Sequence, residues 1–249
     1  MIDKNYSLSA KFYDKLHAGE VEILAESLTK YFFDLGISEG STILDLGSGT
    51  GTLLGQLSNH GLCGTGIEVV PEMVKEAKRK YPSLNFILMD FCCFELDQKF
   101  DVILCTNDSI NNLEPDARGD FFTRIEKHLN PGGKCYIDFD TETDITSFWQ
   151  DQKSVNEGQG WKITRSNFYD QQRCLGTEVH DWIISKNGKT HEFTEVHKLY
   201  PLSPSEVSEL ANNAAMRVVN FIEPTKFRMV DESLDSYLRL GCVLKANVQ

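Results

Sequence analysis

The sequence lacks the features that mark nucleic-acid-binding and membrane proteins. Its 25 Lys and Arg residues are outnumbered by 37 Asp and Glu residues, giving a net charge of −12 and an isoelectric point near 5.0. A surface of this charge repels phosphate backbones and anionic lipid, so we expect no nucleic-acid partner. No stretch approaches the roughly 20 apolar residues of a membrane span, and the start lacks the basic and apolar segments of a signal peptide. We therefore expect a cytoplasmic protein with no membrane partner.

Motifs for metal binding are also missing. The seven cysteines form no CxxC pair, and in a cytoplasmic chain we expect them to be reduced and buried like small apolar residues. The segment HEFTEVH carries His191 and His197 without HExxH spacing. On an extended strand, their spacing would separate the two side chains by about 20 Å. We therefore predict no metal site.

The first half of the sequence shows alternating helix and strand patterns. An amphipathic pattern predicts a helix over 20–36, and residues 41–140 then alternate buried, strand-like runs with helical segments. Several of the runs are almost continuously apolar, as expected when helices cover both faces of a parallel sheet. The predicted strands are TILDLG, GTGIEVV, LNFILMD, FDVILCTND and GGKCYIDFD.

The alternation stops after the fifth strand. Residues 141–200 contain the extended segments WKITRSNFYD, GTEVHDWIIS and HEFTEVHKLY, and the Asn-Gly pair at 187–188 is a strong hairpin signal. We therefore predict an antiparallel β-sheet inserted at 141–200, with 1–140 and 201–249 forming one α/β domain. After the insertion, SPSEVSELANNA predicts a helix, and RVVNFIE and YLRLGCVLKA predict two strands.

Three alternating glycines occupy the first strand-to-helix junction, in STILDLGSGTGTLLGQL. Gly47, Gly49 and Gly51 would let backbone amides approach a ligand at the carboxyl end of the strand. A phosphate-binding P-loop is excluded, because no lysine follows these glycines before Lys75. The dinucleotide fingerprint GxGxxG would need glycine where Thr52 stands. A nicotinamide-dependent oxidoreductase and a glycine turn without ligand remain as alternatives.

Two acids follow at the ends of neighbouring strands. Glu68 ends the second strand, where a carboxylate can accept hydrogen bonds from both ribose hydroxyls of a nucleoside. Asp90 ends the third strand beside Phe91, a place suited to an adenine amine and ring. A solvent-facing Asp90 without a ligand is the alternative.

In order and spacing, LDLGSGTG, GIEVVPEMVKEAKRK, LMDF, FDVILCTND and HLNPGGKCYIDF resemble the motif series of class I S-adenosylmethionine-dependent methyltransferases over residues 6–140. The segment SLSAKFYDKL also resembles the N-terminal part of small-molecule methyltransferases with an insertion after strand 5, including sugar-amine N-methyltransferases. The resemblance implies an α/β fold with a seven-stranded Rossmann-like sheet of order 3-2-1-4-5-7-6, strand 7 antiparallel. It also implies S-adenosyl-L-methionine as cofactor and a small-molecule acceptor methylated on N or O.

The same resemblance implies roles for individual residues. Asp45 would face the methionine part of the cofactor, Glu68 would hold the ribose, and Tyr13 would close over the methyl group. The implied cofactor-binding residues are Tyr13, Asp45, Gly47, Ser48, Gly49, Gly51, Glu68, Val69, Met73, Asp90, Phe91, Cys105 and Asn107.

The sulfonium of S-adenosylmethionine already makes its methyl group electrophilic. The main task of the protein is therefore to align the acceptor lone pair with that methyl group. An amine acceptor must first lose a proton, so a nearby base would help. We predict His17, Tyr13 and Asp108 as catalytic residues. Further candidates for the base are Asp138, Asp140, His180, His191 and His197.

The inserted sheet has three candidate uses. Its aromatic residues could line the acceptor pocket, form the core of the sheet, or make a homodimer contact. They are Trp161, Phe168, Tyr169, Trp182 and Phe193. A cofactor-binding module without catalytic activity is the alternative from another functional class.

Overall fold

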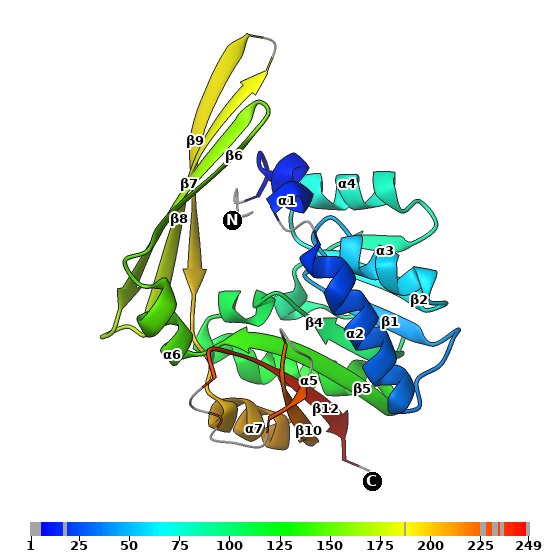
Figure 1. Cartoon of the computed structure of the whole chain (residues 1–249). Helices are drawn as coiled ribbons and strands as arrows, with labels where there is room; N and C mark the ends of the chain where they lie inside the picture. Colours follow the sequence, from blue (N-terminus) through cyan, green and yellow to red (C-terminus); the bar gives the residue numbers. More distant parts are fainter. Residues whose placement is uncertain are drawn as a thin grey trace.

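The computed structural model describes residues 6–16, 19–186, 188–224, 228–230, 234 and 237–247. It contains an eight-stranded mixed sheet, here called the main sheet, and a four-stranded antiparallel sheet, here called the inserted sheet. Figure 1 shows the inserted sheet standing to one side of the main sheet.

The main sheet has the order β3-β2-β1-β4-β5-β12-β10-β11. Its first five strands in chain order are parallel, and β12 runs antiparallel between β5 and β10. This confirms the predicted order 3-2-1-4-5-7-6, with β12 as the antiparallel seventh strand and β11 as a short addition. The strands are β1 (Thr42–Leu46), β2 (Cys63–Glu68), β3 (Asn85–Leu88), β4 (Phe100–Cys105), β5 (Leu129–Asp140), β10 (Met216–Glu223), β11 (Arg228–Met229) and β12 (Arg239–Ala246).

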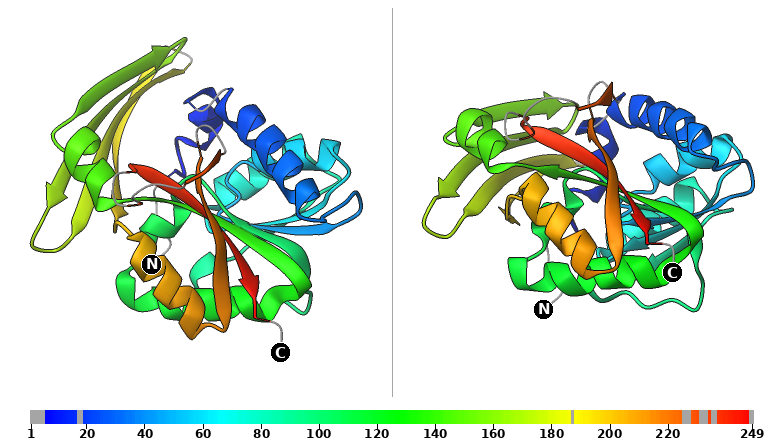
Figure 2. Two further views of the ribbon diagram at one scale, coloured as in Figure 1. Left: turned by 60° about the horizontal axis from the view of Figure 1, so that its bottom comes forward. Right: turned by 90° about the horizontal axis from the view of Figure 1, so that it is seen from below.

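Helices cover both faces of the main sheet (Figure 2). One face packs against α2, α3 and α4 through side chains such as Phe32, Leu54 and Ala77. The other packs against α5 and α7 through Phe121 and Val207. Among the described residues, no helix is long and apolar enough to cross a bilayer. The long helices are α2 (Glu20–Asp34), α3 (Thr52–Asn59), α4 (Pro71–Lys80), α5 (Arg118–His128) and α7 (Pro204–Asn213).

Short helical elements fill the connections. Sequence patterns do not predict those within 142–149, because one or two turns are too short to show a helical period. These elements are α1 (Ala10–Leu16), η1 (Phe91–Cys93), η2 (Ser109–Asn112), η3 (Pro115–Ala117), α6 (Glu142–Asp144) and the π-helical η4 (Ile145–Trp149).

The inserted sheet has the order β6-β7-β8-β9, which confirms the predicted antiparallel insertion. Asn187 of the predicted turn lies outside the described residues. β6 was not predicted, because all six of its residues are exposed and an edge strand with no buried face shows no apolar alternation. The strands are β6 (Lys153–Gly158), β7 (Trp161–Asp170), β8 (Leu175–Lys186) and β9 (Lys189–Leu199).

A buried asparagine joins the two ends of the insertion. Asn111, which is 0% exposed, donates through Nδ2 to the backbone oxygens of Asp140 (2.9 Å) and Tyr200 (3.1 Å). Its Oδ1 accepts from the N–H of Asp140 at 3.0 Å. The guanidinium of Arg118 donates to the Tyr200 oxygen at 2.7 Å. The insertion therefore starts and ends at one hydrogen-bonded point beside β5.

The cysteines differ in part from the expectation. All seven are free. Cys105, Cys135 and Cys242 are buried in central strands. The prediction of burial is wrong for the exposed Cys63, Cys93 and Cys174, and Cys92 is only partly buried. The three exposed thiols occupy a strand end, a short helix and a turn, where the core does not reach.

Candidate active site

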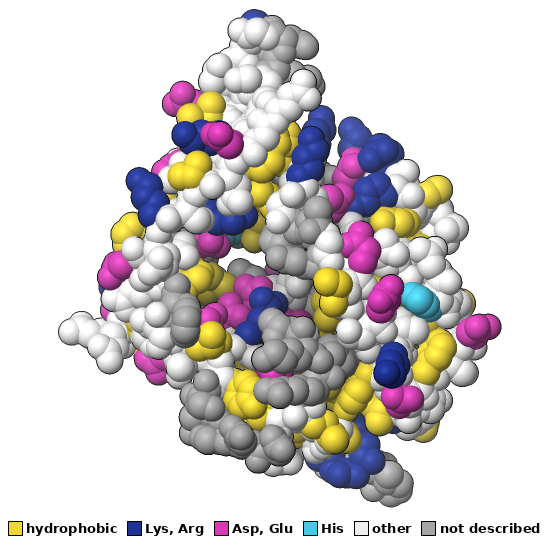
Figure 3. Space-filling model, in the orientation of Figure 1, with side chains coloured by type: hydrophobic (Ala, Val, Ile, Leu, Met, Phe, Trp, Pro, Cys, Tyr) yellow, Lys and Arg dark blue, Asp and Glu magenta, His cyan; other side chains and the backbone are white. Residues whose placement is uncertain are grey.

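Two cavities meet at the glycine junction. The larger, of about 740 Å³, lies between the carboxyl ends of the main-sheet strands and the inserted sheet. The smaller, of about 320 Å³, extends toward α3. Figure 3 shows a hollow between the two sheets in which acidic and basic side chains gather. The residues that line both cavities are Tyr13, Gly47, Gly49, Asn107 and Ser109.

Gly49 and Gly51 have different roles at the junction. All three have positive φ, at 78° for Gly47, 53° for Gly49 and 76° for Gly51. A Cβ on Gly49 would meet only the Tyr13 ring, at 3.8 Å, whereas one on Gly51 would lie 2.5 Å from the Phe86 ring. Gly49 therefore opens the backbone to the cavities, and Gly51 lets α3 pack closely on the sheet.

Glu68 holds the glycine junction from the end of β2. Its Oε2 accepts the N–H of Gly49 at 2.9 Å, and its Oε1 accepts the N–H of Val70 at 2.8 Å. Burial raises the pKa of this carboxyl, and the backbone hydrogen bonds oppose that rise. Glu68 lines the larger cavity together with Val69 and Met73. A carboxylate and apolar surface therefore lie side by side there.

The smaller cavity contains two polar side chains for which the described part of the chain supplies no side-chain partner. Asp45 is 2% exposed, and no described residue forms an ion pair or side-chain hydrogen bond with it. Burial, and then the Glu68 charge, raise the pKa of Asp45 to about 7. The hydroxyl of Ser48, also on this cavity, has no hydrogen-bond partner among the described residues. Such groups suit a ligand that carries a cationic or hydrogen-bonding end.

Of three further residues predicted to contact the cofactor, one lines a cavity and two do not. Asp90 is exposed and lines neither cavity, because its Oδ1 accepts the N–H of Cys92 at 2.8 Å. Phe91 lines the larger cavity and packs on Phe121, with ring centroids 5.7 Å apart. Cys105 is fully buried and lines neither cavity. The cofactor roles of these three residues stay predictions.

The predicted catalytic residues are partly brought together. Tyr13 and Asp108 both line the larger cavity. Asp108 lies 3.2 Å from the guanidinium of Arg239, which also contacts Asp138 at 2.5 Å and Asp140 at 3.8 Å. Burial and the Asp140 charge raise the pKa of Asp108 despite the guanidinium. His17 lies outside the described residues.

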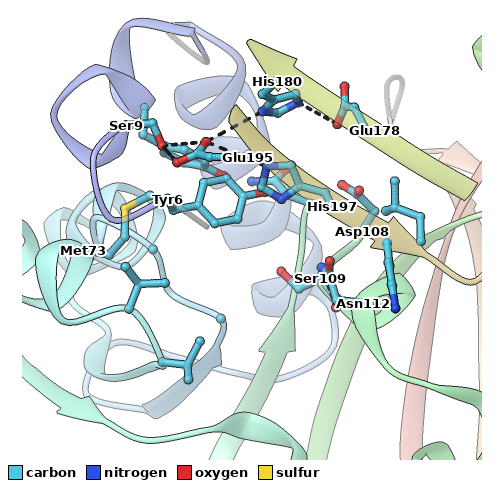
Figure 4. A pocket seen from close by; sticks show the side chains of 18 of the residues that line it. Tyr6, Ser9, Met73, Asp108, Ser109, Asn112, Glu178, His180, Glu195 and His197 are labelled. Atoms are coloured by element: carbon cyan, nitrogen blue, oxygen red, sulfur yellow. Dashed lines mark hydrogen bonds and ion pairs between the residues drawn. The ribbon is translucent and has the colours of Figure 1, made fainter. Parts of the chain in front are cut away.

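The inner face of the inserted sheet forms the opposite wall (Figure 4). Of the predicted aromatic residues, Trp182 lines the larger cavity, and the other four do not. Phe168 is 52% exposed. His191 is exposed and away from the cavity, whereas the other two insertion histidines line it. The residues of this wall include Glu178, His180, Trp182, Glu195 and His197.

Glu178, Glu195 and Arg239 were not among the predicted site residues. The two acids could have been found from the hairpin, because a two-residue turn fixes which residues face each other. That register places Glu178 opposite His197, and His180 opposite Glu195. Arg239 carries no such local signal, since its acidic partners lie about a hundred residues earlier in the chain.

A glycine junction, an acid at the end of the next strand and a cavity at the carboxyl edge define an α/β enzyme with a nucleoside-containing cofactor. A family model described as "Methyltransferase domain" matches residues 43–133. The chain is 30% identical over 251 aligned positions to malonyl-[acyl-carrier protein] O-methyltransferase 1 of Ilyobacter polytropus, covering 93% of this chain and 84% of that protein. The chain belongs to the S-adenosylmethionine-dependent methyltransferases.

Other similarities extend over most of the chain. A dTDP-3-amino-3,4,6-trideoxy-alpha-D-glucopyranose N,N-dimethyltransferase of Streptomyces venezuelae is 24% identical over 184 residues, covering 72% of this chain and 77% of that protein. An S-adenosylmethionine-dependent methyltransferase from Clostridium acetobutylicum has the same fold, with a TM-score of 0.85 at 18% identity over 98% of this chain and 99% of that one. A sugar N-methyltransferase from a Streptoalloteichus species gives a TM-score of 0.73 at 19% identity over 98% and 94%.

Family membership settles the choice of cofactor, which is S-adenosyl-L-methionine rather than a nicotinamide. The residues present fit that group. Asp45 and the Ser48 hydroxyl offer polar atoms that make no side-chain hydrogen bond to another described residue, and Glu68 offers a carboxylate beside the apolar Val69. An amino acid end and a nucleoside end would therefore find matching surfaces on the two sides of the glycine junction.

Proposed function

We propose that this enzyme methylates an amine nitrogen of a small-molecule acceptor that lies between the main and inserted sheets. The observation that carries the proposal is a single cavity of about 740 Å³ lined by the glycine junction, by Asp108 and by the inserted sheet. Methyl donor and acceptor would thus share one space, with Asp108 and Tyr13 beside both.

We assign the cofactor contacts from the residues that line the two cavities. Asp45, Ser48 and Thr106 would hold the amino acid end of the cofactor in the smaller cavity. Glu68 and Val69 would hold the nucleoside end in the larger one. When bound, the cofactor supplies an electrophilic methyl group on a sulfonium. The residues common to both cavities, Tyr13 among them, would surround that methyl group and exclude water from it.

An amine acceptor is supported by the charge around Asp108. Three carboxylates, on Asp108, Asp138 and Asp140, share the single guanidinium of Arg239, so this wall attracts a cation. An ammonium must lose a proton before its nitrogen can react. The raised pKa of Asp108 suits its carboxylate to accept that proton. The nitrogen lone pair then forms the new N–C bond, and the C–S bond breaks with its electrons on sulfur.

The relatives support the same acceptor class. One is named for N,N-dimethylation of an amino sugar nucleotide, and a structural neighbour is a sugar N-methyltransferase. Both cover most of this chain. An amino sugar is therefore the first acceptor to test.

The test is formation of S-adenosylhomocysteine with matched amino and hydroxy compounds. We expect turnover with amino sugars and not with their hydroxyl analogues. Asp108→Asn should bind S-adenosylhomocysteine within threefold of wild type and lose at least a hundredfold in turnover near pH 7, as expected when a proton acceptor is removed. Asp116→Asn, at an exposed acid nearby, is the matched control. Turnover of hydroxyl compounds alone, or full activity in Asp108→Asn, would contradict the proposal.

We also propose the division of the chain into a cofactor-binding part, 1–140 and 201–249, and an acceptor-binding part, 141–200. If copies pair, the outer face of the inserted sheet, with Phe168 and Val196 exposed, is the surface we assign to the homodimer contact. Sedimentation of the 28.2 kDa chain with and without Phe168→Ser tests that contact.

A further inference from the structure

Four polar side chains form a block on the inner face of the inserted sheet. Glu178 lies directly opposite His197, and His180 lies directly opposite Glu195, in the β8–β9 pairing. Alternate residues of a strand point to the same face, so all four project from one face of the sheet. All four line the larger cavity. We call them the His-Glu block.

Glu195 is the fixed centre of the block. It is 3% exposed, and its carboxylate accepts the Ser9 hydroxyl at 2.8 Å and the Trp182 indole N–H at 3.0 Å. No described Lys or Arg forms an ion pair with it. A buried carboxylate is costly unless a cation or several donors compensate it. Glu195 is therefore positioned by neutral donors, and its ion-pair partners within the described part of the chain are the two histidines.

The two histidines present nitrogens to the same carboxylate oxygen. Nδ1 of His180 lies 4.0 Å and Nε2 of His197 lies 3.8 Å from Oε2 of Glu195. One ligand atom from each of the three residues lies within 4.8 Å of the others. His197, 4% exposed, has no hydrogen-bond partner for its Nε2 among the described residues. Figure 4 shows both rings turned toward Glu195.

These separations are close to those of a metal site. A tetrahedral ion with ligands at about 2.1 Å holds them about 3.4 Å apart. Each nitrogen would need to move by about half an ångström toward Oε2, and the two nitrogens, which lie within 4.8 Å of each other, would need to approach by up to about 1.4 Å. The other nitrogen of His180 lies 2.9 Å from Oε2 of Glu178. A carboxylate at that position orients a metal-binding histidine and fixes which nitrogen is free to bind. Glu178 therefore serves as the outer partner of His180.

We propose that His180, Glu195 and His197 bind a divalent transition-metal ion, Zn²⁺ or Fe²⁺, at the wall of the acceptor cavity. Two histidines and one carboxylate are a donor set that both ions accept. Three protein ligands would leave a coordination position open, and all three line the cavity. The open position would take an oxygen or nitrogen atom of the acceptor and orient it. The binding of the ion does not depend on the proposed methylation of an amine.

The test is titration calorimetry with Zn²⁺ and Co²⁺ as probes. The protein carries no affinity tag, is stripped of metal with a chelator and is free of S-adenosylmethionine. We expect one ion per chain with a dissociation constant below about 10 μM and visible Co²⁺ d–d absorption. His180→Gln and His197→Gln should each weaken binding at least tenfold. The control is His191→Gln, which changes an exposed histidine on β9, the strand that also carries His197. This variant should bind Zn²⁺ and Co²⁺ as wild type does.

Thermal unfolding supplies a second readout if a variant is unstable. Zn²⁺ should raise the Tm of wild type and of His191→Gln, because an ion that binds only the folded state stabilises it. It should leave the Tm of Glu195→Gln unchanged. The proposal would be overturned if wild type bound no stoichiometric metal ion. It would also be overturned if His191→Gln lost as much metal affinity as His180→Gln and His197→Gln. Binding of S-adenosylhomocysteine to the same samples separates this failure from failure of the methyltransferase assignment.

Discussion

The Oε2 atom of Glu68 accepts the backbone N–H of Gly49 at 2.9 Å, which links the end of β2 to the glycine junction after β1. The other oxygen of the same carboxylate accepts the N–H of Val70 at 2.8 Å. One side chain therefore fixes the backbone at two adjacent strand ends. The shape of the junction and the position of the carboxylate depend on each other.

Glu68→Gln should weaken binding of S-adenosylhomocysteine by at least tenfold. The amide can accept one of the two backbone hydrogen bonds, but its NH₂ group faces the other donor, so the junction loosens. Calorimetry at about pH 7 measures the change. Glu72→Gln, at an exposed acid of α4, should leave the affinity unchanged. Equal affinities for all three proteins would show that Glu68 does not contact the cofactor.

Gly51→Ala and Gly49→Ala should separate packing from ligand binding. Alanine at position 51 collides with the Phe86 ring, at 2.5 Å, and should lower the free energy of unfolding by about 2–4 kcal/mol. Alanine at position 49 meets only Tyr13, at 3.8 Å, and should cost about 1 kcal/mol because of its positive φ. Gly49→Ala should nevertheless weaken S-adenosylhomocysteine binding more than tenfold, because Gly49 lines both cavities and the added methyl group would occupy ligand space. Urea unfolding and calorimetry on both variants would refute this if the two effects were reversed.

Asp45→Asn should stabilise the cofactor-free protein at high pH. The folded protein holds the Asp45 proton up to a pKa of about 7, whereas an unfolded chain releases it near 3.9. Stability from this group is therefore complete below about pH 4 and is lost as the pH rises to about 7. At about pH 8 the variant should be more stable than wild type by up to about 4 kcal/mol. Urea unfolding near pH 4 and near pH 8 checks whether the difference vanishes at the lower pH.

Asn111→Ala should lower the free energy of unfolding by about 2–4 kcal/mol, because it removes three buried hydrogen bonds to the backbone of Asp140 and Tyr200, including the one that the Asp140 N–H donates. Limited proteolysis should also cut faster within 141–200. The control is Asn112→Ala, which removes one exposed hydrogen bond of 3.2 Å. Identical unfolding curves for the two variants would mean that this connection does not hold the insertion.

The main sheet was predictable because its signals are local. β1 is a short apolar run followed by the glycine junction, and β2 ends in the acid Glu68. The acceptor side of the cavity depends on contacts between residues that are distant in the sequence. The His-Glu block exists only through the pairing of β8 with β9, and Arg239 reaches Asp138 from a distant strand. Periodicity along one strand reveals neither, because the information lies in the register between strands.

The amide of Asn111 has a consequence beyond stability. Because the chain leaves the main sheet and returns to it at nearly the same point, residues 141–200 behave as a cassette whose ends are already joined. Another sequence of different length could be grafted there without disturbing the strands that hold the methyl donor. The architecture thus lets acceptor choice diverge while donor recognition is inherited unchanged.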